Sequence, residues 1–276
     1  RVERRRYAVA RVARVLPLFY FVVVIAGVVL LAGGPSFYGF HGTGMFLMNV
    51  LLIYGTDVLW SIPVEIQYYI VFVFIWMSYA SGRHLTCLAV IIALQAATAV
   101  LSYLTIVEAR ILSFWMQFFL FGHLLALVLQ TRRANMRRCA AHPLTAPAAW
   151  LVLAIAVIAP PEVRRELGWP VLHNFMDPVS AGYPALITVF ALLAVGPFAL
   201  LSNRLFRWLG GISFSLYLLH WPIVRNAKEI LGEWAEVPGA GFAFVLITSL
   251  ALSALANRVL ELPAQTALRR RFMSPR

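Results

Sequence analysis

The sequence predicts an all-α protein, a bundle of helices that cross a membrane. Of its 276 residues, 62% are hydrophobic and only 12% are charged, whereas about a quarter of the residues in a soluble domain are charged. Apolar residues also form repeated runs of about 20, the length of helix that crosses a bilayer. Both observations exclude a soluble protein built around one large core.

We expect about eight membrane spans. They cover residues 15–32, 62–80, 85–107, 111–130, 145–160, 183–201, 212–232 and 239–260. The span at 145–160 is the weakest, because it is short and Pro143 and Pro147 lie at its start. Residues 44–59 are also apolar, and we expect them to form an outer-face or re-entrant segment rather than a ninth span.

The basic residues support this topology. The net charge is +12, and Lys228 is the only Lys. With eight spans and a cytoplasmic start, the Arg clusters within 1–14, 132–138 and 269–276 all fall inside, as the positive-inside rule requires. A ninth span would move the cluster at 132–138 outside. We therefore expect both ends to be cytoplasmic, and the Arg clusters to face lipid rather than nucleic acid.

Arg11 and Arg14 stand at the mouth of the first span, followed by Pro17. Their spacing of one helical turn lets both guanidinium groups face the same way. Two forked donors in a site of low dielectric constant suit a phosphate or pyrophosphate group. A positive-inside anchor explains the pair equally well.

A second candidate site follows Trp60. Ser61 can cap a helix and Pro63 fits a first helical turn. Glu65 then enters a span, where a carboxyl group costs free energy unless it has a partner or is protonated. Glu65 is therefore a candidate general acid or base; the alternative is an acid tied to a neighbouring helix.

A third candidate is the polar helix face of Ser213, Tyr217 and His220. Their i, i+4, i+7 spacing places them on one side of an apolar helix, so this side should face the bundle interior or a wet cavity. Histidine titrates near neutral pH, which makes His220 a candidate proton carrier; a histidine bonded between packed helices is the alternative. Pro222 should free backbone carbonyl groups near His220.

Other polar residues have plainer roles. We expect Glu261 to form an ion pair with an inner arginine such as Arg11 or Arg14. His41, His173 and Asp177 lack the spacing of metal ligands, so we predict no metal site. Cys87 and Cys139 suggest no disulfide framework.

Together the motifs resemble the acyltransferase 3 family of integral membrane acyltransferases. Its Arg-x-x-Arg motif with a later Pro resembles Arg11, Arg14 and Pro17. Its Trp-Ser-Leu-Ser-x-Glu-x-Gln-Phe-Tyr motif resembles Trp60, Ser61, Glu65, Gln67 and Tyr69, with Pro63 replacing the second Ser. Its Gly-x-Ile-Ser-Tyr-x-x-Tyr-x-x-His-x-Pro motif resembles Ser213, Tyr217, His220 and Pro222, with Phe214 replacing Tyr. Its Glu-x-Pro motif resembles Glu261 and Pro263. The motifs keep the family's order over essentially the whole chain.

The resemblance implies that an acyl group, often acetyl, passes from cytoplasmic acyl-CoA to a hydroxyl of a cell-envelope glycan or a secreted small molecule. No bound cofactor is implied; acyl-CoA is the co-substrate. The implied catalytic residues are Glu65, Tyr217 and His220, and the implied substrate-binding residues are Arg11, Arg14, Trp60, Gln67 and Ser213.

The family's first span carries a His regarded as catalytic, and its second a Ser-Gly-Phe element. Neither occurs here. We therefore expect residues 1–276 to form a single membrane domain, the last eight spans of a ten-span fold in a bacterial inner membrane, with the main base on an upstream span. One alternative is a transporter or flippase for an anionic or glycan substrate, since such proteins also use intramembrane His and Glu residues and broken helices. The other alternative is a non-catalytic fragment.

Overall fold

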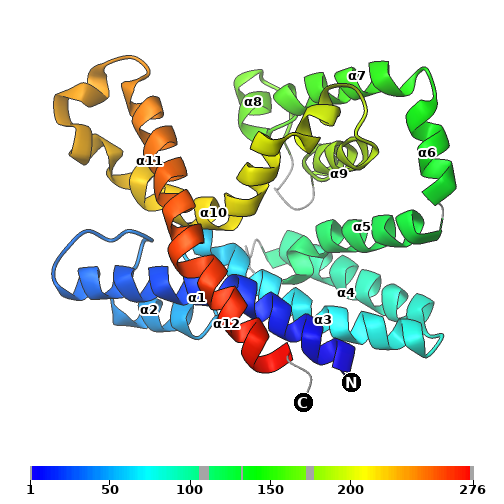
Figure 1. Ribbon diagram of the computed structural model, residues 1–276, viewed down its shortest axis with the longest axis horizontal. Helices are drawn as coiled ribbons and strands as arrows, with labels where there is room; N and C mark the ends of the chain where they lie inside the picture. Colours follow the sequence, from blue (N-terminus) through cyan, green and yellow to red (C-terminus); the bar gives the residue numbers. More distant parts are fainter. Residues whose placement is uncertain (1, 106–111, 132, 172–176, 274–276) are drawn as a thin grey trace. The chain divides into compact units, whose positions relative to one another are not determined.

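The structure, a computed structural model, is helical throughout the part of the chain that it describes (Figure 1). It describes all residues except 1, 106–111, 132, 172–176 and 274–276. No β-strand occurs among the described residues. This confirms the predicted class, an all-α protein with membrane-spanning helices.

The chain divides into two compact units, Arg1–His84 with Gly210–Arg276, and Leu85–Leu209. The first unit contains α1 (Val2–Leu31), α2 (Thr43–Val50), η1 (Asp57–Trp60), α3 (Ser61–Ala80), most of α10 (Arg204–Leu231), η3 (Gly232–Glu236), α11 (Ala240–Ala256), η4 (Asn257–Glu261) and α12 (Leu262–Met273). The second contains α4 (His84–Thr105), α5 (Leu112–Thr131), α6 (Arg133–Ala141), α7 (Thr145–Ile158), α8 (Pro161–Glu166), α9 (Pro178–Leu193) and η2 (Gly196–Ser202). These are called unit 1 and unit 2 below.

Seven of the eight expected spans fall on a continuous helical segment, whereas 183–201 is divided between α9 and η2. Not every one of these segments is long and apolar enough to cross a membrane alone. Five described segments are long and apolar enough to cross a membrane: Arg5–Leu31, Asp57–Ala80, His84–Leu101, Leu112–Thr131 and Ala240–Phe272. A sixth is possible if α9 and η2, which are bent by 69°, form one broken span. Helix α7 is short, at 14 residues, and α10 carries polar residues that lower its hydropathy. The boundary expected near 107–111 lies outside the described residues.

Residues 44–59 do not form a long helix. Helix α2 has only 8 residues, well short of the about 20 needed to span a bilayer, and a turn separates it from η1. Buried Asn49 holds this turn, because its side-chain oxygen accepts a hydrogen bond from the Thr56 backbone N–H at 3.2 Å. Gly55 allows the chain to turn tightly because it lies against the Trp60 backbone. A Cβ added to Gly55 would lie only 2.3 Å from the Trp60 Cα.

Helix α1 supplies much of the core of unit 1. Its residues Leu18, Phe19, Val22, Val23 and Ala26 are all buried, and their spacing places them on one side of the helix. Helix α1 packs against α12, α2, α3 and η4. The helix that carries Arg11 and Arg14 is thus fixed on several sides.

Unit 2 has a smaller core where α7, α9 and η2 meet around Ala149, Val152 and Phe198. Between α4 and α5, Gln95 donates a side-chain hydrogen bond to Gln117. Such polar bonds help to hold helices together in lipid.

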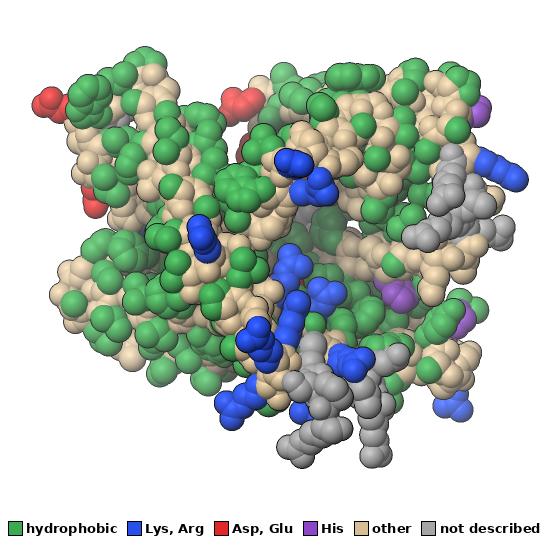
Figure 2. Space-filling view, in the orientation of Figure 1, with side chains coloured by type: hydrophobic (Ala, Val, Ile, Leu, Met, Phe, Trp, Pro, Cys, Tyr) green, Lys and Arg blue, Asp and Glu red, His purple; other side chains and the backbone are tan. Residues whose placement is uncertain are grey.

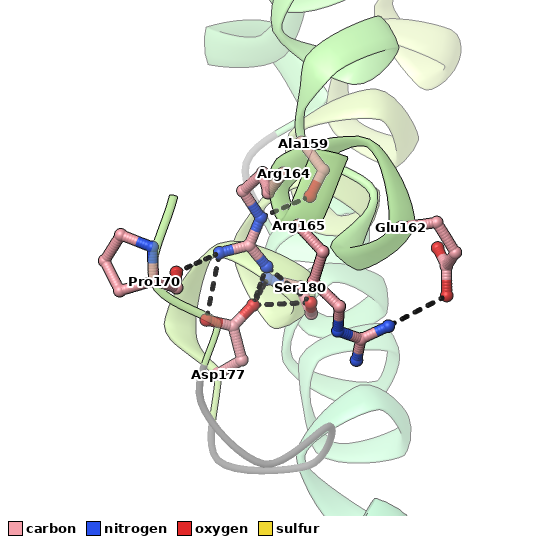
Figure 3. A network of polar contacts seen from close by, with 7 residues as sticks. All are labelled: Ala159, Glu162, Arg164, Arg165, Pro170, Asp177 and Ser180. Carbon is pink, nitrogen blue, oxygen red and sulfur yellow. Dashed lines mark hydrogen bonds and ion pairs between the residues drawn. The ribbon is translucent and has the colours of Figure 1, made fainter. Parts of the chain in front are cut away.

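A buried ion pair secures the start of α9 (Figure 3). The Arg164 guanidinium binds the Asp177 carboxylate, and both side chains are at most 5% exposed. Arg164 also donates to the Ala159 carbonyl at 2.9 Å. Asp177 caps α9 by accepting a hydrogen bond from the Ser180 backbone N–H at 2.8 Å. Helix α8 and the first turn of α9 are therefore joined.

Candidate functional site

Residues from three of the predicted motifs lie in unit 1. Helix α1 carries Arg11 and Arg14, α3 carries Glu65, and α10 carries Tyr217 and His220. Most of these side chains are half-buried, whereas Arg14 is exposed.

Arg11 contacts two tyrosine rings that meet edge to face, with ring centres 6.2 Å apart. Its guanidinium carbon is 5.3 Å from the centre of the Tyr7 ring and 5.5 Å from that of Tyr69, which belongs to α3. Aromatic faces attract a cation electrostatically. A phosphate or carboxylate instead binds a guanidinium at its N–H edges. The rings therefore position Arg11 without occupying all its donors.

Tyr69 also connects Arg11 to the predicted acid. Its hydroxyl donates a hydrogen bond to Oε1 of Glu65, one helical turn earlier in α3. Glu65 thus has the partner that a carboxyl group inside a span requires. The result is a continuous series of contacts from Arg11 through Tyr69 to Glu65.

The start of α3 differs from the prediction. Ser61 does not cap the helix, because η1 leads directly into α3 and Trp60 is already in a helical conformation. Ser61 instead lies close enough to the Tyr217 hydroxyl to interact with it. Pro63 lies in the first turn of α3, as predicted.

Tyr217 joins α10 to this region. Its hydroxyl donates a hydrogen bond to the Val58 carbonyl in η1 at 2.6 Å, and it lies within electrostatic range of Glu65. In the described part of the chain, His220 forms no hydrogen bond with Glu65. The structure therefore brings Tyr217 into range of the predicted acid.

His220 has one defined hydrogen bond. Its Nδ1 lies 3.0 Å from the Leu216 carbonyl oxygen, one turn earlier in α10. Because a carbonyl only accepts, Nδ1 must carry the proton in this bond. Nε2 is then the nitrogen that can accept a proton, as a general base requires.

The segment before α3 holds the helix that carries His220. Asp57 Oδ2 accepts hydrogen bonds from Trp221 Nε1 and from Arg225 Nη1, each at 2.9 Å. Asp57 has a φ of 41°, which is uncommon for a residue other than glycine and marks local strain. Tyr38 makes a further bond to the Leu218 carbonyl at 2.9 Å. These bonds fix α10 on either side of His220.

Three predicted binding residues occupy separate positions. Ser213 is exposed, and its hydroxyl donates to the Gly210 carbonyl at 2.9 Å in its own helix. Trp60 ends η1, and Gln67 lies in the first half of α3; both are half-buried. The binding roles of these three residues remain predictions.

The expected ion pair of Glu261 with Arg11 or Arg14 does not form. Glu261 is buried, and its carboxylate accepts hydrogen bonds from Ser215 at 2.6 Å, Asn257 at 3.0 Å and Gln265 at 3.1 Å. Ser215 is fully buried on α10. Glu261 therefore connects α10 to η4 and α12, through neutral donors. The four-residue spacing of Asn257, Glu261 and Gln265 was the available sequence signal for this cluster.

Two further observations concern unit 2 and metals. A cavity of about 470 Å³ lies between α5 and α9, lined mostly by apolar residues. None of the predicted site residues lines it. Among the described residues no group of three or more His, Cys, Asp or Glu could hold a metal ion; His173 lies outside those residues, and Asp177 is bound to Arg164.

Comparison with known families adds one finding. The family model described as an acyltransferase domain, that of acyltransferase 3, matches residues 1–258. The chain belongs to the acyltransferase 3 family. The predicted resemblance is thereby confirmed, and with the apolar helices it identifies an integral membrane protein of an acyltransferase family. No curated protein and no solved structure matches the chain. Helix α12 follows the matched residues of this acyltransferase 3 protein.

Proposed function

We propose that the protein transfers an acyl group, such as acetyl, from cytoplasmic acyl-CoA to a hydroxyl group of a cell-envelope glycan or a secreted small molecule. The observation that carries this proposal is the series Arg11, Tyr69 and Glu65. It joins a cation suited to phosphate with a carboxyl group inside one membrane-spanning unit. Family membership supports acyl transfer in general.

The proposed reaction is substitution at a thioester. The acceptor oxygen attacks the thioester carbonyl carbon, a base takes the hydroxyl proton, and the bond from carbon to sulfur breaks. The CoA thiolate leaves and receives a proton. Positioned proton transfer contributes about 10² to 10⁴-fold to such reactions.

The described residues suit separate parts of this reaction. Arg11 and Arg14 bind phosphate groups of the donor, since guanidinium groups form paired hydrogen bonds with phosphate. Nε2 of His220 accepts a proton, and Glu65 and Tyr217 orient polar groups of the substrate.

The test uses membranes that contain the full-length protein and acyl-CoA labelled in the acyl group. We expect equal amounts of free CoA and of a labelled product that mild alkali hydrolyses, as an oxygen ester requires. The His220→Gln variant should lower kcat by about 10²-fold or more with little change in KM. Release of free CoA without labelled ester would contradict transfer to a hydroxyl group.

A second candidate function is transport of an anionic or glycan substrate. It is favoured by the bend of 69° between α9 and η2, because transporters use broken helices to line substrate sites. Ala194 and Gly196 at this break have φ values of 52° and 57°. Movement of labelled substrate into vesicles that contain no acyl-CoA would support transport and not transfer.

A further inference from the structure

The last long helical segment of unit 1 is longer than a bilayer is thick. Ala240–Phe272 contains 33 residues, which at 1.5 Å per residue measure about 50 Å. The hydrocarbon core is about 30 Å thick, and about 40–45 Å with the headgroup layers. The end of α12 therefore extends beyond the headgroups when α11 begins at the opposite surface. Helix α1, with 30 residues, measures about 45 Å.

These two long helices end together. Helix α12 packs along α1, and the start of α1 and the end of α12 lie near one another in unit 1 (Figure 1). Their exposed arginines include Arg5 and Arg6 of α1, and Arg269 and Arg271 of α12. Figure 2 shows basic side chains gathered where these helix ends lie. We call these four residues the arginine surface.

The arginine surface lacks neutralising partners within the described part of the chain. None of its four residues forms an ion pair with a described carboxylate, and Glu261, the acid that directly precedes α12, is buried among neutral donors. Like charges within about 10 Å repel one another at physiological salt. A bound polyanion relieves this repulsion and is attracted to the surface.

We propose that the arginine surface binds a water-soluble molecule that carries several phosphate groups. Charge complementarity favours phosphate, and the extension past the headgroup layer favours a soluble molecule over a lipid headgroup. Arg269 and Arg271 point to different sides of α12 because they are two residues apart, which suits several phosphates better than one. If the proposed function is correct, the molecule is the acyl-CoA donor, and the surface binds its nucleotide end.

The experiment measures binding to the full-length protein in phosphatidylcholine nanodiscs at low salt. The probes are coenzyme A, adenosine 3′,5′-bisphosphate and pantetheine, which lacks phosphate. The test variant is Arg269→Gln/Arg271→Gln. The control, Arg165→Gln/Lys228→Gln, removes the same charge from two exposed positions elsewhere in the chain.

We expect both phosphate probes to bind and pantetheine not to bind. The test variant should weaken phosphate binding by roughly tenfold or more, because it removes two of the four charges that attract the polyanion. The control should bind like the wild type. Equal binding by both variants would overturn the proposal. The proposal would also be overturned if the two variants bound the phosphate probes differently only in nanodiscs that contain phosphatidylglycerol. The surface would then bind lipid headgroups.

The result is separable from the proposed function. Phosphate binding that depends on Arg269 and Arg271, without acyl transfer by any form of the protein, would support the surface and contradict the acyltransferase reaction. Acyl transfer by a protein whose test variant binds phosphate unchanged would support the acyltransferase reaction and contradict the arginine surface.

Discussion

The Tyr38 hydroxyl donates a hydrogen bond to the Leu218 carbonyl at 2.9 Å. Leu218 lies four residues before Pro222, which has no N–H to offer this carbonyl in the helix. Tyr38 thus takes the place of the missing backbone donor. Burial raises the pKa of Tyr38 well above its ordinary value, so the hydroxyl keeps its proton at physiological pH.

Tyr38→Phe should lower the free energy of unfolding by about 1–3 kcal/mol, the cost of leaving a buried polar group without a partner. The cost should be smaller in a Pro222→Ala background, because an alanine in place of the proline restores an N–H for the Leu218 carbonyl. Unfolding of the four proteins in one detergent measures the coupling. Equal costs in both backgrounds would show that Tyr38 does not replace the proline donor.

Gly39→Ala should weaken the contact of Asp57 with α10. Gly39 has a φ of +64°, and an added Cβ would lie 2.8 Å from Asp57 Oδ2, the atom that accepts hydrogen bonds from Trp221 and Arg225. Gly42→Ala is the matched control, because Gly42 also has a positive φ, +94°, but no atom lies within 4 Å of an added Cβ. Both variants should be strained, and Gly39→Ala should be less stable by about 1–3 kcal/mol more. Equal thermal unfolding temperatures for the two variants would contradict the close contact between Gly39 and Asp57.

The Arg164–Asp177 pair should make stability depend on pH at acidic values. The Arg164 guanidinium lowers the pKa of Asp177 from 3.8 to about 2. A carboxyl group whose pKa is lower in the folded state stabilises the fold fully above about pH 4, and this stabilisation is lost as the pH falls towards 2. Thermal unfolding between pH 2 and 6 should show this loss in the wild type, and Asp177→Asn should remove it.

Asp177→Asn should also destabilise the protein at neutral pH by about 3–5 kcal/mol, because it leaves a buried guanidinium without its counter-ion. Glu162→Gln is the control: its pair with Arg165 is largely exposed, with an N to O distance of 3.9 Å, and such pairs contribute about 0–1 kcal/mol. Similar losses of unfolding free energy in both variants would show that burial does not make the Arg164–Asp177 pair more important than the exposed pair.

Arg11→Lys should lower kcat/KM for acyl transfer by on the order of tenfold or more, although it keeps the charge. Lysine lacks the planar group that contacts the rings of Tyr7 and Tyr69 and cannot form paired hydrogen bonds with phosphate. Steady-state rates with varied acyl-CoA give the measurement. Full activity of Arg11→Lys would indicate that charge alone matters at this position.

The sequence predicts local features of this fold well. The helices follow from long apolar runs, and the carbonyl freed by Pro222 follows from the chemistry of proline, so both could be anticipated. The Ser61 cap was wrong because the preceding turn η1 continues into α3, which the composition of Trp60 and Ser61 does not reveal.

Contacts between distant segments could not be predicted in the same way. Ser215 and Glu261 are 46 residues apart in the chain, and helical spacing tells which side of a helix is polar but not which helix faces it. For this reason Glu261 was assigned to an arginine rather than to Ser215, and Tyr38 and Asp57 were not recognised as supports of α10.

The most direct test of the central claim compares Arg14→Ala with Arg83→Ala in the full-length protein, using transfer from labelled acyl-CoA. Both arginines are exposed, but only Arg14 belongs to the predicted donor site. We expect Arg14→Ala to abolish labelled ester formation while the purified variant keeps the thermal stability of the wild type, and Arg83→Ala to remain active. Undiminished transfer by Arg14→Ala would contradict the role of this arginine pair in binding the acyl donor.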